Sequence, residues 1–432
     1  MIKRDRKTGG HVPFPATVAL ALALALSLAG LLPACDWFSP GSGATNCADY
    51  DFALPPDFAP PPHPAGVCIT PERVALGRRL FYEAALSRDA NQSCASCHIQ
   101  KLAFSDGRAR SLGSTGATHP RNALALTNAG YFSTLTWFNP EVTRFDNQVL
   151  IPLFSENTNT TIEEMAISGM EWVVTRRLQS DDANPSYSQM FVAAFPERGL
   201  NAGSAPKDVG RIMHITNVAR ALAAFQATMV AYRSPYDRGD LSPAASRGRE
   251  LFESERTGCA DCHSGVNLNR DRETQRLNYY NIGLYNVGLQ NDYPDQALHG
   301  SRAAPRQTQG LHLVTGRPED RGRFRTPSLR NVAVTGPYMH DGSIETLAEV
   351  VAHFNAGGRN IKSGPLAGDG RKNLHKDPRI RPLELSADEE RDLVAFLESL
   401  TDECFLNDPR FSDPDAPPPE PPAHCRAAPS QP

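Results

Sequence analysis

The sequence has no excess of basic residues, and no run of them forms a stripe. Its 432 residues include 44 Lys and Arg against 48 Asp and Glu, which gives a formal net charge of −4 at pH 7. Proteins that bind nucleic acid through its phosphates need a positive surface. The composition therefore excludes a nucleic-acid partner.

Alternating strand patterns are also few and short, whereas helical periodicity is clear. Apolar residues recur at helical spacing in residues 217–233. They are Val218, Leu222, Phe225 and Met229. Residues 386–400 begin with Ser386 and Glu389 in the positions of a capping box. Long Gly- and Pro-rich connections fill the rest, so the sequence predicts a mostly α fold.

The N-terminus is typical of an exported protein. Basic residues precede the apolar run TVALALALALSLAGLLPAC, which has the length of a signal peptide and ends in small residues. Leu32 stands three positions before Cys35, as in a bacterial lipoprotein signal. We therefore predict a signal peptide over residues 1–34 and a periplasmic protein, attached to the membrane only through a lipid on Cys35. A plain transmembrane anchor is the alternative.

Export changes the interpretation of the nine cysteines, because disulfides persist in oxidising compartments. Four cysteines fall in two C-x-x-C-H motifs, and Cys35 would carry the lipid. Those that remain are Cys47, Cys68, Cys404 and Cys425. An even remainder suggests disulfides that tie the ends of the mature chain to its body, and three pairings are possible.

An internal near-repeat indicates two related domains. The segments LGRRLFYEAALSRDANQSCASCH and RGRELFESERTGCADCH both run Gly-Arg-x-Leu-Phe, then a polar stretch, then C-x-x-C-H. We predict an N-terminal domain over residues 71–240 and a C-terminal domain over residues 241–405. A Pro-rich tether over residues 35–70 and a Pro-rich tail over residues 406–432 flank them.

Each C-x-x-C-H motif predicts one covalently bound haem c. Two thiols at this spacing form thioethers to the haem vinyl groups, and the adjacent imidazole becomes an axial ligand of the iron. A zinc site would need a closed set of four ligands, and a redox dithiol has no need of the histidine. The residues predicted to hold the haems are Cys94, Cys97, His98, Cys259, Cys262 and His263.

The segments that follow resemble the bacterial dihaem cytochrome c peroxidase superfamily, which includes MauG. They are THPRNALALTNAGYFSTLTW, IEEM and GRFRTPSLRNVAVTGPYMHDGSIETL, and together with GLYNV they look most like its MbnH-type branch. The resemblance covers roughly residues 71–400. It implies a peroxidase-like oxidoreductase built from two cytochrome c-like helical haem domains with long loops.

The resemblance also implies that the N-terminal haem binds peroxide, beside three named residues. Glu164 matches a distal carboxylate that moves the protons of the peroxide, although an apparent insertion, NTNTT, leaves Glu156 and Glu163 as competitors. Gln148 matches an amide that orients the peroxide. Trp137 matches an indole that relays oxidising equivalents between the haems. Solvated loop residues and a core Trp are the plainer alternatives.

A Ca²⁺ ion between the domains is implied as well, since amide, hydroxyl and carbonyl oxygens suit a hard cation. Its matching ligands are Asn122, Thr335 and Pro337. His340 and Asp341 are expected to order the region between the haems. We expect His119 to be a loop or cap histidine.

The second axial ligand of the C-terminal haem departs from the family. The family has a Met there, or a Tyr in MauG, fourteen residues after the His of the motif PY-x-H, and counting from His340 gives Phe354. Phe cannot bind iron, so we predict His353 as the ligand. A histidine cap at a helix C-terminus and ligation by Met339 are the alternatives. A haem with two His ligands has a low potential, which disfavours an electron-accepting peroxidase.

We therefore predict an enzyme that uses H₂O₂ to form a high-valent dihaem state and oxidises a partner protein. By resemblance, the target is a Trp on a small exported copper-binding protein of the MbnP type, converted to kynurenine. The alternative is a dihaem cytochrome c peroxidase that reduces H₂O₂ with electrons from a small redox protein. A dihaem cytochrome that only transfers electrons is a third possibility.

Overall fold

The computed structural model describes residues 50–426, apart from residues 57, 63–66, 155–163, 181–182, 202–203, 205, 287–308 and 364–366. The predicted signal peptide and lipid site lie outside these residues. The described residues all belong to one compact unit of the chain, residues 46–432. Within the described part, no helix combines the length and apolar character needed to cross a membrane.

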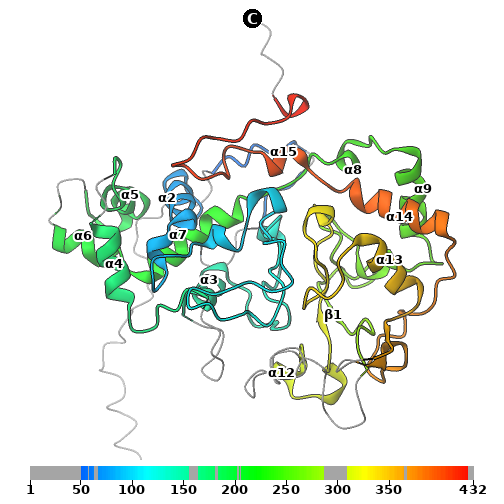
Figure 1. Ribbon diagram of the computed structural model, residues 1–432. Coiled ribbons are helices and arrows are strands. Elements are labelled where there is room, and N and C mark those ends of the chain that lie inside the picture. Colours follow the sequence, from blue (N-terminus) through cyan, green and yellow to red (C-terminus); the bar gives the residue numbers. More distant parts are fainter. Residues whose placement is uncertain are drawn as a thin grey trace, which may run out of the picture. The chain divides into compact units, whose positions relative to one another are not determined.

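The fold is mostly helical, as predicted (Figure 1). The N-terminal half contributes α2 (Pro71–Tyr82), α3 (Phe145–Phe154), α4 (Glu171–Gln179), α5 (Tyr187–Ala194), α6 (Pro206–Ile212) and α7 (Ile215–Ala227). The C-terminal half contributes α8 (Pro235–Arg238), α9 (Pro243–Glu253), α10 (Cys259–Cys262), α12 (His312–Thr315), α13 (Leu347–Asn355), α14 (Ala387–Glu398) and α15 (Glu403–Leu406). Two antiparallel pairs of short strands join β1 (Tyr279–Tyr280) to β2 (Phe324–Arg325) and β3 (Asn360–Ile361) to β4 (Gly368–Asp369).

Both helices predicted from periodicity are present. The four apolar residues expected on one face of α7 are at most 1% exposed, although the helix ends at Ala227 and the last of them lies in the following turn. α14 begins with the predicted capping box, in which Ser386 Oγ accepts from Glu389 N and the Glu389 carboxylate accepts from Ser386 N.

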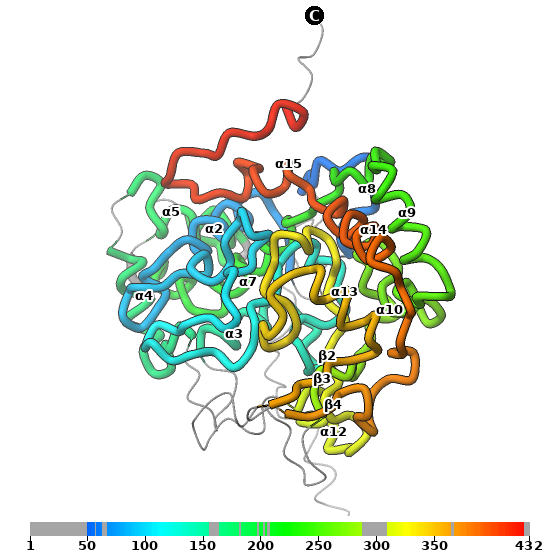
Figure 2. The backbone as a smooth tube through the Cα atoms, turned by 45° about the vertical axis from the view of Figure 1, so that its right-hand side comes forward, coloured from blue at the N-terminus to red at the C-terminus, as the bar shows by residue number. Residues whose placement is uncertain are grey.

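The near-repeat folds into two helix pairs that pack in the same way. α2 packs on α7 and α9 packs on α14, and Figure 2 shows the second pair side by side. A Cβ added to Gly77 would lie 1.9 Å from the backbone oxygen of Ala221, and one added to Gly248 would lie 1.9 Å from that of Asp392. Only glycine permits such a close approach of two helix backbones.

Each helix pair places a Phe against the histidine of its C-x-x-C-H motif. The ring centroids of Phe81 and His98 are 6.4 Å apart, and so are those of Phe252 and His263. The same two Phe rings also contact a Phe of the partner helix, α7 or α14. Each pair lies in its own cluster of buried apolar residues, so the repeat in the sequence is also a repeat in packing.

The end of the chain returns to the N-terminal half. Phe405, Leu406 and Phe411 belong to the apolar cluster built around α2 and α7. The Tyr82 hydroxyl donates to the Phe411 carbonyl at 2.7 Å. In Figure 1 this red segment runs back toward the blue α2. The predicted Pro-rich tail therefore begins buried against the first domain.

A disulfide closes this returning segment. Cys404 and Cys425 are bonded, with a sequence separation of 21, which is one of the pairs that the sequence left open. Cys68 is disulfide-bonded as well. Cys47 lies outside the described residues.

We expect Gly248→Ala to destabilise the protein, because the new methyl group would overlap the Asp392 carbonyl and push α9 away from α14. Overpacking of this kind costs about 1–3 kcal/mol, measured as a loss of the free energy of unfolding in denaturant titrations. Gly210→Ala in α6 is the control, since its Cβ would meet only the end of the Gln179 side chain. Equal stabilities of the two variants would contradict the close helix contact.

Candidate functional site

Each C-x-x-C-H histidine is oriented by one hydrogen bond to the backbone. His98 Nδ1 lies 2.6 Å from the oxygen of Phe104, and His263 Nδ1 lies 2.7 Å from the oxygen of Leu268. A carbonyl only accepts, so Nδ1 carries the proton in both rings and Nε2 keeps its lone pair, as in metal-binding histidines. Burial lowers the pKa of both imidazoles, that of His263 to about 4, which keeps the rings neutral.

The two motifs line two neighbouring cavities. The cavity with His98 has a volume of about 150 Å³, and the cavity with His263 about 230 Å³. All four motif thiols are free of disulfides. The walls of the second cavity are mainly apolar and include Phe252, Leu347 and Val351. Paired thiols, a neutral imidazole and apolar walls are what a haem c requires, so the residues fit the predicted cofactors.

The residues predicted to handle peroxide come together in the first cavity. Glu164, Gln148 and Trp137 line it together with His98. Gln148 projects from α3, and Glu164 precedes the buried segment that leads to α4. The competing carboxylates, which lie outside the described residues, are Glu156 and Glu163.

A histidine that the sequence assigned to a loop or cap also belongs to this cavity. His119 Nε2 lies 3.0 Å from Glu164 Oε1. Burial alone would raise the pKa of Glu164, but the adjacent His119 imidazole lowers it. The carboxylate therefore stays ionised and can accept a proton. Sequence reasoning missed this pair because its members are far apart in the chain and belong to no shared motif.

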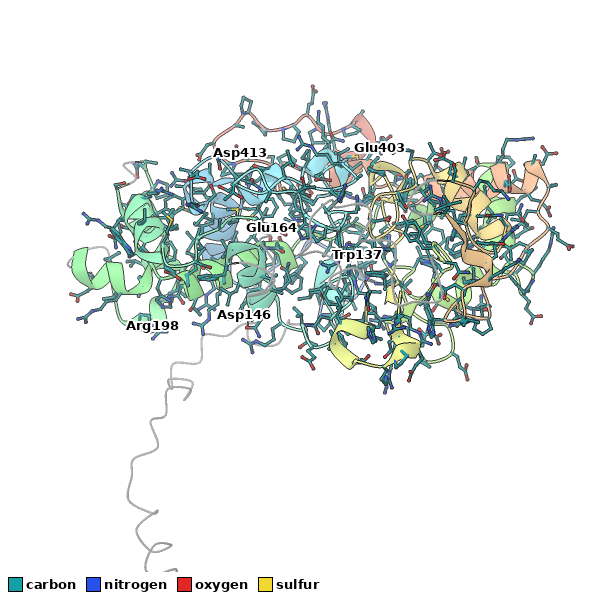
Figure 3. All side chains as sticks on the ribbon, turned by 60° about the horizontal axis from the view of Figure 1, so that its bottom comes forward. Trp137, Asp146, Glu164, Arg198, Glu403 and Asp413 are labelled. Carbon is teal, nitrogen blue, oxygen red and sulfur yellow. A yellow bond between two sulfur atoms is a disulfide. The ribbon has the colours of Figure 1, made fainter. Side chains whose placement is uncertain are left out.

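Trp137 lines both cavities, and Arg325 is the other residue that does so among those described. The Trp137 Nε1–H donates to the Asn122 carbonyl at 2.8 Å, and the Trp137 carbonyl accepts from Arg325 N at 2.8 Å. Figure 3 labels Trp137 and Glu164 among the side chains. A relay between two cofactors needs a position on the boundary of both cavities, and Trp137 has one.

His340 and Asp341, which we expected to order the region between the haems, are buried there. The His340 ring stacks on Phe324 with centroids 3.7 Å apart, and the Tyr285 hydroxyl donates to the Asp341 carboxylate. The His340 carbonyl accepts from Asn122 N at 2.9 Å. This last hydrogen bond joins a loop of the N-terminal half to a loop of the C-terminal half.

The predicted Ca²⁺ ligands are only partly brought together. Asn122 Nδ2 donates to the Arg108 carbonyl at 2.8 Å, and Thr335 Oγ1 donates to the Val332 carbonyl at 3.1 Å. The Asn122–His340 bond brings the loop of Asn122 to the segment that follows Thr335 and Pro337. The calcium site stays a prediction.

Phe354 lines the second cavity, whereas His353 is not one of its wall residues. His353 is 5% exposed, and its Nε2 lies 3.1 Å from the Ile282 carbonyl. Binding to iron through Nε2 would require this contact to break, and since His353 is not on the cavity wall the end of α13 would have to turn. Met339 does line the cavity. Ligation by His353 stays a prediction, which this geometry does not favour.

Comparison with known proteins identifies relatives over most of the chain. Residues 71–241 match the family described as di-haem cytochrome c peroxidase. Cytochrome-c peroxidase IdrP1 of Denitromonas iodatirespirans is 35% identical, over 85% of this chain and 93% of its own length. Methylamine utilization protein MauG of Methylorubrum extorquens is 33% identical, over 78% of this chain and 81% of its own.

The solved structures agree with these relatives. The crystal structure of a MauG-like protein associated with microbial copper homeostasis is 40% identical and has a TM-score of 0.73. The match covers 84% of this chain and 99% of that chain. The dihaem peroxidase BthA from Burkholderia thailandensis is 25% identical, covers 78% of this chain and 88% of that chain, and has a TM-score of 0.56.

The variant His353→Ala tests whether His353 is the second axial ligand of the C-terminal haem. Because His353 Nε2 is held on the Ile282 carbonyl, we expect the electron paramagnetic resonance signals of the haem-loaded variant to match those of the unchanged protein. His312→Ala, at a half-buried histidine that lines neither cavity and whose Nδ1 lies 2.7 Å from the Arg317 carbonyl, is the control. Loss of a low-spin signal in His353→Ala alone would establish His353 as the ligand.

Proposed function

The chain belongs to the di-haem cytochrome c peroxidase family, which includes MauG, and on that premise we propose that it is an exported enzyme that uses hydrogen peroxide to oxidise a side chain of a partner protein. Membership of the family makes the chain a peroxidase-type oxidoreductase with two c-type haems. We assign the covalent attachment of these haems to the two C-x-x-C-H motifs and place the enzyme in the periplasm, with a lipid on Cys35.

The observation that carries the proposal is the position of Trp137 on the walls of both cavities. In the first cavity it faces the same space as the Glu164–His119 pair and Gln148. A cytochrome that only transferred electrons would have no use for a Glu–His pair in the cavity of one of its haems. The combination of a proton-handling pair with an indole between two cavities supports a reaction with peroxide followed by transfer of the oxidising equivalents.

Glu164 and His119 would handle the protons of the peroxide. The ionised Glu164 carboxylate can accept a proton from the bound peroxide and return it to the leaving oxygen, which is general acid–base catalysis. His119, 3.0 Å away, stabilises the ionised carboxylate before the first transfer and after the second. The Gln148 amide can orient the peroxide by hydrogen bonds. The haem iron, when bound, supplies the coordination site for peroxide and the redox chemistry.

For the partner, we propose a small exported copper-binding protein of the MbnP type, in which a Trp is converted to kynurenine. Peroxide is the oxidant: two molecules supply the two oxygen atoms that open the indole ring, and they are reduced to water. Hydrolysis of the resulting N-formyl group gives kynurenine and releases the former C2 carbon as formate. The 40% identical structure supports this choice, because it is described as MauG-like and associated with microbial copper homeostasis. Phe354 supports it as well, since it removes the Met or Tyr ligand that the resemblance predicts at this position.

A second candidate is a peroxidase that takes electrons from a small redox protein. The relative IdrP1, which is named a cytochrome-c peroxidase and is 35% identical over 93% of its length, favours it. The two functions differ in the source of the electrons. In the first they come from a side chain of the partner protein, and in the second from the reduced cofactor of a donor.

The haem-loaded enzyme, mixed with hydrogen peroxide and a candidate copper-binding partner, tests the proposal. We expect mass spectrometry to detect oxidation of a partner Trp. Trp137→Phe should slow this oxidation strongly and leave the first reaction with peroxide intact, because the indole acts after that step. Trp172→Phe is the control, since Trp172 is 64% exposed on α4. Rapid peroxide turnover with a reduced cytochrome and an unmodified partner would favour the second candidate.

The pH dependence of the peroxide reaction tests the Glu164–His119 pair. Because the pKa of Glu164 is lowered by His119, we expect kcat/KM for peroxide to fall only below the ordinary pKa of a glutamate. In His119→Ala the carboxyl remains partly buried without its partner, so its pKa rises and the acid limb moves to higher pH. Glu164→Gln should reduce the rate by about 10²–10⁴-fold.

His312→Ala serves as the control here too. If the acid limb of the kcat/KM profile is the same in His119→Ala as in the unchanged protein, the Glu164–His119 pair does not take part in the reaction with peroxide.

A further inference from the structure

Arg325 carries a buried charge at the boundary of the two cavities. It is the second residue of β2, it is 2% exposed, and it lines both cavities. Its Nε and Nη1 atoms have no hydrogen-bond partner in the part of the chain that the structure describes. Its neighbours in space are aromatic, with the guanidinium 5.0 Å from the centre of the Phe132 ring.

This arrangement is energetically unfavourable for the polypeptide alone. A buried guanidinium requires a counter-charge or a full set of hydrogen-bond acceptors. The contact with the face of Phe132 offsets only part of the cost of desolvation. Burial lowers the pKa of Arg325 to about 10, although the nearby Tyr279 acts in the opposite direction. The described side chains therefore supply no anion for this cation.

Arg330, on the same segment, shows how the chain pairs a buried guanidinium when it can. Arg330 is 4% exposed, and its Nη1 donates to both carboxylate oxygens of Asp237 at 2.9 and 2.8 Å. Its Nε donates to the Val266 carbonyl at 2.7 Å. Arg325 is buried as deeply, but its polar atoms point to cavity space instead of a carboxylate.

We propose that the Arg325 guanidinium is a shared binding group for the propionate carboxylates of both haems. This inference rests on the proposed function, because it requires a haem in each cavity. The planar guanidinium presents several N–H donors that match carboxylate oxygens in pairs. The position of Arg325 on both cavity walls lets one cation serve an anionic group on either side.

The backbone of Arg325 is hydrogen-bonded to Trp137, the residue that carries the indole. Arg325 N donates to the Trp137 carbonyl at 2.8 Å, so the carboxylate-binding group and the predicted relay share one hydrogen bond. A cation beside the propionates of both haems favours the less positive, reduced state of each iron. Arg325 is therefore a positioning residue that also raises both reduction potentials.

Spectroelectrochemical titration of the haem-loaded protein tests the inference with Arg325→Met, which keeps the length of the side chain and removes its charge. We expect both midpoint potentials to fall. They should also begin to depend on pH, because propionates released from the cation regain an ordinary carboxyl pKa and titrate. Arg325→Lys, which keeps the charge and loses the paired donors, should shift both midpoints less.

Arg323→Met is the matched control. Arg323 is two residues away, its Nη1 lies 3.4 Å from Asp320 Oδ1, and it lines neither cavity. If the midpoint potentials of Arg325→Met equal those of the control, Arg325 does not bind the propionates. If only one potential shifts, Arg325 does not serve both haems. If Arg325→Met does not accumulate with two haems, Arg325→Gln and Arg325→Lys are titrated in its place.

Haem content, measured first on the unchanged protein, separates this inference from the proposed function. If the protein binds two covalent haems and the Arg325 variants do not change their midpoint potentials, the inference about Arg325 is wrong and the proposed function is unaffected. A chain that carries no covalent haem after export would reject the proposed function.

Discussion

The close approach of two helix pairs is the constraint on which the rest of the structure depends. Gly77 and Gly248 each leave no room for a side chain against the backbone of the partner helix. This contact fixes a Phe ring from each pair beside a motif histidine, 6.4 Å away in both halves. Because the two cysteines stand next to that histidine in the chain, the helix contact determines where the thiols and the imidazole lie. Helix packing, and not the long loops, therefore sets the positions of both cofactor sites.

Local patterns were enough to predict the elements that build these sites. The spacing of apolar residues predicted α7, a capping box predicted the start of α14, and the near-repeat predicted two equivalent packing units. Each of these signals depends on residues close together in the chain, where helix geometry relates sequence to space. The resemblance to a known family named Glu164, Gln148 and Trp137, and the structure brings these three to one cavity.

Local patterns could not predict contacts between segments that are far apart in the sequence. His119 was predicted as a loop or cap histidine and does lie in a loop, but its contact with Glu164 at 3.0 Å could not be predicted from the sequence. Neighbouring residues of a helix differ by a rotation of about 100°, and the structure has Phe354, not His353, on the cavity wall; ligation of the iron by His353 stays a prediction. The return of Phe411 to the first domain was missed because a Pro-rich composition favours an extended tail and does not reveal what a single aromatic residue packs against.

The boundary between the two cavities holds both the hydrogen bonds that join the two halves and the residues we propose to act between the haems. Hydrogen bonds that cross between the halves gather there, including Asn128 to Asn267 at 2.9 Å and Tyr279 to Thr134 at 3.0 Å. Trp137 and Arg325 belong to the same network through their backbone bond. A chain that moves oxidising equivalents between two cofactors must hold both at a fixed separation, since the rate of transfer depends on it. Trp137, which we propose as the relay, and the buried Arg325 both take part in the hydrogen bonds that join the halves. The halves therefore cannot separate without breaking the contacts of both residues.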